Sequence, residues 1–136
     1  MLRHLLAAEA PSLEVEVDSA GTGDYHIGDP PDLRSQRAAA LRGIDLSGLR
    51  ARQVTADDFQ QFDLILAMDR KNLRDLQAIK PKNSHATLRL FLDYAPQMHA
   101  VDVPDPYFGG AADFEQVLDL TAAAARGLIG ELKSRA

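Results

Sequence analysis

Leu64-Ile65-Leu66-Ala67-Met68 decides the fold, because these consecutive residues are all apolar and offer no polar face. A strand buried on both sides of a parallel sheet has this composition, whereas a strand with one face in water alternates apolar and polar residues. Asp69 follows and is well placed to cap a helix from Arg70 to Ile79, which Pro81 stops. The stretch therefore predicts a strand followed by a helix in an α/β protein.

Two more segments predict strands. Thr87 to Leu92 is one, although Arg89 interrupts its apolar pattern. Leu13 to Val17 alternates apolar and charged residues, which is typical of a half-buried strand. Ahead of the central stretch, Thr55-x-x-Asp58 resembles a capping box that opens a short helix.

Helices are predicted at both ends of the chain and after the first strand. Met1 to Ala8 has leucines at helical spacing but no capping residue, so either a terminal helix frays or an earlier element is missing. Leu33 to Arg42 is closed by Gly43, and Asp113 is expected to cap a long last helix. The predicted inner face of that helix consists of Phe114, Val117, Leu118, Thr121, Ala125, Leu128 and Leu132.

The order of these elements predicts an α/β fold in one domain over residues 1–136. We expect a three-layer sandwich, in which helices cover both faces of a small parallel sheet. Three strands are few for five helical segments, which suggests that a strand is absent.

The composition excludes several classes of protein. A net charge of −5 argues against nucleic acid or an anionic membrane surface as a partner. No apolar run is long enough to span a bilayer, and Glu9 and Pro11 cut short the N-terminal apolar segment, so we expect a soluble cytoplasmic protein. The chain has no cysteine, which excludes a disulfide or a thiol nucleophile within these residues. Its four histidines are scattered, so neither a metal nor another cofactor is expected.

Val103-Pro104-Asp105-Pro106-Tyr107-Phe108-Gly109-Gly110 is the strongest candidate for chemistry. Each proline fixes its own φ and favours an extended residue before it, so this stiff loop can aim the Asp105 carboxylate. Tyr107 and Phe108 can wall a slot for a flat apolar group. The residues alone leave two interpretations open: a general acid at the mouth of a site, or a proline-rich turn whose Asp caps a neighbour.

Asp18-Ser19-Ala20-Gly21-Thr22-Gly23 is a polar, glycine-rich loop after the first predicted strand. Ligands of open α/β sheets bind at the carboxyl ends of strands, although ordinary loops have the same composition. Arg50 and Arg52 lie in a short extended piece, where we expect surface ion pairs rather than a site for an anion.

Seven segments, taken in order, resemble the low-molecular-weight protein-tyrosine phosphatases over nearly the whole chain. They are Asp18-Ser19-Ala20-Gly21-Thr22, Gly28-x-Pro30-Pro31-Asp32, Gly43-Ile44-x-Leu46, Ala51-Arg52-Gln53, Phe62-Asp63-Leu64-Ile65-Leu66-Ala67-Met68-Asp69, Asn72-Leu73-Arg74-Asp75-Leu76 and Asp105-Pro106-Tyr107. The resemblance implies hydrolysis of phosphotyrosine or aryl phosphate monoesters through a cysteinyl-phosphate intermediate. The implied partner is a phosphotyrosine-containing protein or a small aryl phosphate.

The resemblance also implies roles for the candidate residues. Asp105 matches the general acid that protonates the leaving phenolate, whose pKa is about 10, and that later acts as the base toward water. Tyr107, Phe108 and Tyr25 match residues that flank the phenyl ring of the substrate. Ser19 matches a residue that hydrogen-bonds the catalytic loop and orients it.

The same resemblance implies parts that these residues lack. Family members have a first, central strand that leads into a C-x-x-x-x-x-R loop, which holds the nucleophile, and Met1 matches a position in the helix after that loop. We expect a start assigned at an internal Met or a truncated gene, so the first, central strand is missing. Its two neighbours, near Val15 and Leu66, then close up or keep hydrated edges, or the chain is unstable.

The expected function is therefore that of a protein-tyrosine phosphatase whose nucleophile lies outside these residues, so that this chain alone is inactive. The alternative is a non-catalytic pseudo-phosphatase module that binds phosphotyrosine. Arsenate reduction on the same scaffold is disfavoured, because that reaction also needs cysteines.

Overall fold

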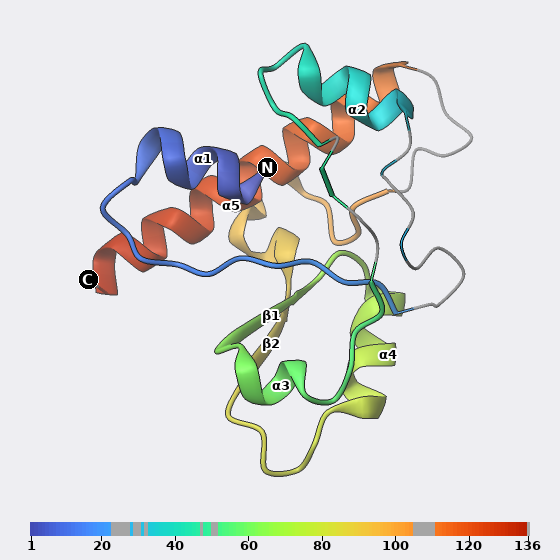
Figure 1. The fold of residues 1–136 in the computed structure, drawn as a ribbon, viewed down its shortest axis with the longest axis vertical. Helices are drawn as coiled ribbons and strands as arrows, with labels where there is room; N and C mark the ends of the chain where they lie inside the picture. The colour runs from blue at the N-terminus through green and yellow to red at the C-terminus, as the bar shows by residue number, and fades with distance from the viewer. Residues whose placement is uncertain are drawn as a thin grey trace.

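The computed structural model describes residues 1–22, 28, 31, 33–46, 48–49, 52–104 and 111–135. Figure 1 shows how the helices and strands of these residues are arranged. The elements are α1 (Leu2–Glu9), α2 (Leu33–Ala40), α3 (Asp58–Gln61), β1 (Leu64–Ala67), α4 (Arg70–Ile79), β2 (Thr87–Leu90), the 3-10 helices η1 (Phe91–Tyr94) and η2 (Pro96–Met98), and α5 (Ala111–Arg135). The α/β class predicted from the sequence is confirmed.

The unit predicted around the central apolar stretch forms as expected. β1 pairs with β2 in parallel, from Leu64 opposite Thr87 to Ala67 opposite Leu90. The Asp69 carboxylate caps α4, accepting a hydrogen bond of 2.7 Å from the Asn72 amide. Met68 was expected to belong to the buried strand, but it lies beyond β1 and its residue is 38% exposed.

Alternate residues of β1 pack into two different apolar clusters. Ile65 and Ala67 pack with Leu76 of α4, whereas Leu66 packs against a cluster formed by α1, η1 and α5. The buried members of that second cluster are Leu5, Leu6, Ala10, Phe91, Leu92, Ala95, Leu120, Ala124, Ala125 and Ile129. Helices therefore cover both faces of the sheet, as predicted.

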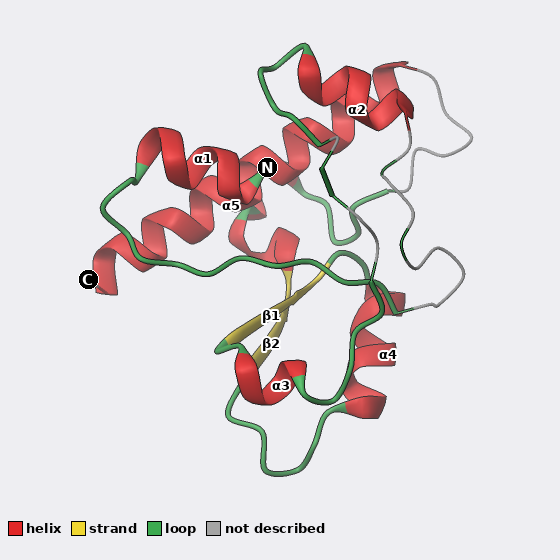
Figure 2. Cartoon of the chain, viewed as in Figure 1, coloured by secondary structure: helices red, strands yellow, loops and turns green. Residues whose placement is uncertain are grey.

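The segment Leu13–Val17 does not form the predicted strand. Figure 2 draws it as an extended loop that crosses between the helices and the two-stranded sheet. Leu13 and Val17 still pack against the cluster of α1 and α5, and Arg3 Nε donates to the Val17 carbonyl at 3.0 Å. Within the described residues no strand lies beside this segment, so its alternating pattern has no ladder to join. Leu13–Val17 therefore does not pair with β1, whose ladder partner is β2.

The strand predicted over Thr87 to Leu92 ends two residues early, at Leu90. β1 has only four residues, so the parallel ladder stops at Leu90. The chain then turns into η1, where Phe91 and Leu92 are both buried against α5. In a strand these neighbours would point to opposite faces, whereas the 3-10 turn places both in one core.

The terminal helices form where predicted, with differences at their ends and in the buried face of α5. α1 has no side-chain cap, as expected. α5 begins at Ala111, so Asp113 lies inside the first turn and is not the predicted cap. Of the predicted inner face of α5, Phe114, Ala125 and Leu128 are buried and the other four residues are half-buried. Leu120, Ala124 and Ile129 are buried although they were not predicted, and α1, α2 and η1 all contact this helix. Among the described helices none has the length and apolar character needed to cross a membrane.

Candidate active site

Two loops are fastened to the first turn of α4, next to the carboxyl end of β1. One loop leads toward Asp105. Its Asp102 carboxylate accepts a 2.8 Å hydrogen bond from the backbone N–H of Arg70, and the Val103 amide donates to the Met68 carbonyl at 2.8 Å. The chain is thus fixed to the end of β1 just before the proline-flanked stretch.

The other loop is the polar segment at residues 18–22. Gly21 forms an isolated parallel bridge, donating to the Arg52 carbonyl and accepting from the Val54 amide, both at 2.8 Å. Its neighbour Thr22 accepts a hydrogen bond of 3.3 Å at Oγ1 from the Asn72 side chain. Asn72 lies in the first turn of α4, so both loops meet at that turn.

A partly buried ion pair between Arg52 and Asp58 lies next to the second loop, because Gly21 is bonded to the Arg52 carbonyl. Asp58 is 7% exposed, and its two oxygens accept from Nη2 and Nη1 of Arg52 at 3.0 and 3.1 Å. The Thr55 amide also donates to Asp58 at 2.8 Å, which is one half of the predicted capping box, although α3 itself begins at Asp58. The Nε of Arg52 lies 3.2 Å from the Asp18 carboxylate, an ion-pair contact without hydrogen-bond geometry.

The prediction of ion pairs for Arg52 is therefore confirmed, whereas Arg50 lies outside the described residues. Burial raises the pKa of Asp58, whereas the hydrogen bonds from Arg52 and Thr55 lower it. Together the hydrogen bonds outweigh burial, so the pKa of Asp58 is below its usual value. A carboxyl whose pKa is depressed by folding adds stability above its unfolded pKa and loses that contribution as the pH falls through the folded value.

Asp58→Asn is expected to lower the free energy of unfolding by about 1–3 kcal/mol at pH 7, because it removes the charge that pairs with Arg52. Since the Arg52 side chain is 35% exposed, we expect the lower half of that range. The difference from the wild type should shrink between pH 7 and pH 3, because the unfolded carboxyl takes up a proton near its ordinary pKa of 3.8 while the native one does so only at lower pH. Urea unfolding at both pH values measures it.

Asp57→Asn is the matched control, because Asp57 is the adjacent carboxylate and is exposed. It is expected to change the free energy of unfolding by no more than about 0.5 kcal/mol. Equal effects of the two substitutions would contradict a stabilising role for the contacts of the buried Asp58 carboxylate with Arg52 and Thr55.

Of the predicted site residues, only Ser19 belongs to the described part of the chain. It is exposed, and its amide donates to the Asp18 carboxylate at 2.8 Å, so the network of Arg52 also bears on the position of Ser19. Asp105, Tyr107, Phe108 and Tyr25 lie outside the described residues. Thr22 and Asp102, which precede Tyr25 and Asp105 by three residues each in the sequence, are both bound to the first turn of α4.

Sequence reasoning missed Asp102, Arg70 and Asn72 as parts of this framework. Asp102 and Arg70 are 32 residues apart, and Asn72 and Thr22 are 50 apart. No local pattern marks such pairs. Asp102 and Val103 join the loop to the end of β1 and the start of α4, and this is visible only in the three-dimensional structure.

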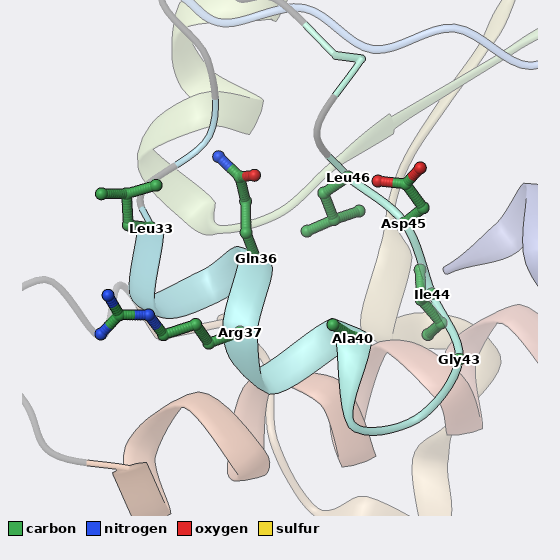
Figure 3. A pocket seen from close by; sticks show the side chains of 8 residues that line it. All are labelled: Leu33, Gln36, Arg37, Ala40, Gly43, Ile44, Asp45 and Leu46. Carbon is green, nitrogen blue, oxygen red and sulfur yellow. The ribbon is translucent and has the colours of Figure 1, made fainter.

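A groove of about 410 Å³ lies elsewhere, between α2 and the turn that follows it. Figure 3 shows the side chains of Gln36 and Leu46 on either side of it, with Gly43 at the turn. Gly43 has a φ of +79°, which confirms the predicted helix closure. The residues that line the groove include none of the predicted site residues.

No three His, Asp or Glu side chains gather as a metal site requires within the ranges that the structure describes. The framework can therefore be described through its own hydrogen bonds and ion pairs. These bonds join two loop ends, at Thr22 and at Asp102–Val103, to the segment that links β1 and α4.

Comparison with known proteins gives one consistent result. The sequence model "Low molecular weight phosphotyrosine protein phosphatase" matches residues 1–136. The protein of that name from Gallus gallus is 42% identical over 121 residues, which are 88% of this chain and 75% of the relative. The low molecular weight protein-tyrosine-phosphatase YfkJ from Bacillus subtilis is 34% identical over 133 residues, 98% of this chain and 84% of the relative.

Solved structures agree with the sequence comparison. A crystal structure of protein tyrosine phosphatase from Entamoeba histolytica, with Hepes in the active site, superposes with a TM-score of 0.91 at 30% identity. The match covers 98% of this chain and 85% of that one. The YfkJ structure superposes with a TM-score of 0.87 over 98% of this chain.

Proposed function

The chain belongs to the low molecular weight phosphotyrosine protein phosphatase family, and on that premise we propose that its residues serve the hydrolysis of phosphotyrosine in proteins and of small aryl phosphates. The observation that carries the proposal is the match of the family over residues 1–136. The shared anchoring of the two site loops at the first turn of α4 supports it.

Asp105 is the proposed general acid. An aryl phosphate leaves as a phenolate whose conjugate acid has a pKa of about 10, so protonation of the leaving oxygen lowers the barrier. An ordinary Asp has a pKa of about 3.9 and is ionised at neutral pH, so this role requires an apolar wall or a phosphate dianion nearby. Tyr107 and Phe108 follow Asp105 in the sequence and are the proposed wall.

The other assignments follow the family pattern. Tyr107, Phe108 and Tyr25 are proposed to flank the phenyl ring of the substrate. Ser19 is proposed to orient the phosphate-binding loop. The hydrogen bond that its backbone N–H donates to the Asp18 carboxylate supports a fixed position for this residue. A cytoplasmic location is part of the same proposal and rests on the sequence alone.

The nucleophile is not among these residues. The 136 residues contain no cysteine, so they cannot supply the thiolate that forms the cysteinyl-phosphate intermediate. We propose that they contribute the acid, the aromatic slot and the framework that holds them.

The purified 136-residue chain is expected to hydrolyse an aryl phosphate no faster than buffer, because no thiolate is present. A chimera that restores before Met1 the family's first strand, its C-x-x-x-x-x-R loop and the start of the helix that follows is expected to be active, and its Cys→Ser form inactive. Release of phosphate measures all three.

Turnover by the unmodified chain would contradict the absence of a nucleophile. A folded chimera without turnover would contradict the proposal that these 136 residues contribute the general acid and the substrate slot of a phosphatase.

The absence of cysteine favours one other function, a pseudo-phosphatase module that binds phosphotyrosine without cleaving it. This module would need measurable affinity in the unmodified chain. Calorimetric titration with a phosphotyrosine peptide separates the two proposals, because the first one requires the phosphate-binding loop for affinity and the second does not.

A further inference from the structure

We infer that Asp102 is a positioning residue for the loop that carries Asp105, and that it acts by joining this loop to the first turn of α4. The inference deepens the proposed function and rests on it for the role of Asp105. The contacts of Asp102 stand independently of that role.

Asp102 binds one residue of α4 in two ways. Its Oδ1 accepts from the Arg70 backbone N–H at 2.8 Å, and its Oδ2 accepts from Nη2 of the Arg70 guanidinium at 3.1 Å. The Nε of Arg70 lies 3.3 Å from both oxygens. On the next residue, the Val103 amide donates to the Met68 carbonyl. Two adjacent residues are thus bound to the segment that joins β1 to α4.

The backbone contact explains why an acidic residue stands here. The first amides of a helix have no partner within the helix. Asp69 satisfies the amide of Asn72, and Asp102 satisfies that of Arg70 from a distant part of the chain. Both carboxylates lie at the positive end of the helix dipole. The hydrogen bonds from the Arg70 side chain and backbone, with Arg74 nearby, hold the pKa of Asp102 below its usual value.

This anchor lies close to the proposed acid. Pro104 separates the bound residue Val103 from Asp105, and Pro106 follows. A proline fixes its own φ and restricts the residue before it, so few torsions between the anchor and the carboxylate are free. From this sequence we expect the position of Asp102 and Val103 to restrict where the Asp105 carboxylate can lie.

The two contacts of Asp102 should contribute unequally. The Arg70 side chain is 67% exposed, and ion pairs of this kind contribute little. The Arg70 backbone amide has no alternative partner within the helix, so of the two contacts of Asp102 this bond should contribute more to holding the loop. Loss of the carboxylate should therefore matter more than loss of the guanidinium.

Fluorine NMR of the 136-residue chain labelled with 3-fluorotyrosine tests this without turnover. The chain has three tyrosines, at positions 25, 94 and 107, and Tyr→Phe variants assign their signals. Asp102→Ala is expected to shift the Tyr107 signal and to leave that of Tyr94, on η1, in place. Asp102→Asn should shift Tyr107 less, because its amide oxygen still accepts from the Arg70 N–H. Arg70→Met should shift it least.

Asp75→Ala is the matched control, because it removes an exposed carboxylate that pairs with Lys71 on the same helix. It should leave the Tyr107 signal unchanged. Three results would overturn the inference. The Tyr107 signal does not shift with Asp102→Ala, it shifts equally with Asp75→Ala, or it shifts only when the Tyr94 signal shifts as well. If Asp102→Ala fails to fold, the two milder variants decide: Asp102→Asn must shift the Tyr107 signal more than Arg70→Met does, and the reverse order would overturn the inference. Since no catalysis is measured, this result is independent of the tests of phosphatase activity.

Discussion

In the active chimera, Asp105→Asn is expected to lower kcat for phenyl phosphate by about 10²–10⁴-fold. The amide of Asn cannot donate a proton to the leaving oxygen, so phenolate must depart as an anion whose conjugate acid has a pKa of about 10. The steady-state rate of phenol release measures the loss. KM should change little, because the substitution keeps the shape of the side chain.

The dependence on the leaving group separates an acid from a residue that merely shapes the site. A phenol made more acidic by nitro groups needs less protonation, so the effect of Asp105→Asn should shrink along a series of such substrates. Asp75→Asn, which removes an exposed carboxylate on α4, should leave kcat unchanged for every substrate. The comparison is made in kcat/KM, which covers the steps up to cleavage of the ester and excludes hydrolysis of the cysteinyl phosphate. An equal loss of kcat/KM for good and poor leaving groups would show that Asp105 is not the proton donor.

The parts of the fold that the sequence predicted correctly are those whose causes are local. β1 and α4 follow from a run of apolar residues and from a cap that reaches three residues along the chain, from Asp69 to Asn72. The closure of α2 at Gly43 depends on one residue with positive φ. In each case the residues that cause the structure are also those that show the pattern.

The errors concern segments whose structure is decided by a distant partner. Leu13–Val17 has the pattern of a strand, but a strand exists only beside another strand. Phe91 and Leu92 have the composition of a strand, but the length of β1 and the position of α5 decide where the ladder ends. Neither partner can be located from the segment itself.

The candidate site divides in the same way. The residues proposed to carry the chemistry stand in recognisable motifs, and their proposed roles come from the resemblance to the family. The framework that holds their loops is made of single contacts between distant residues, such as Asp102 with Arg70 and Thr22 with Asn72. Such contacts leave no periodicity, so only the three-dimensional structure shows them.

The close approach of α5 to η1 also escapes the sequence, and it carries the largest expected effect on stability. Gly127 lies where α5 crosses η1, and a Cβ built on it would be 1.9 Å from the carbonyl oxygen of Tyr94 and 2.9 Å from its carbonyl carbon. Both atoms belong to the backbone and cannot rotate away. Gly127→Ala is therefore expected to lower the free energy of unfolding by at least about 2 kcal/mol, as measured by urea denaturation.

Gly130→Ala gives the opposite expectation one turn further along α5. No atom lies within 4 Å of a Cβ built at Gly130, so only the higher helix propensity of Ala acts, and the substitution should stabilise the chain by about 1 kcal/mol. Since both changes are chemically the same and lie in one helix, a difference in sign isolates the contact with Tyr94. If Gly127→Ala were stabilising as well, α5 could not lie this close to η1, and the path of the chain from β2 toward Asp102 would have to differ.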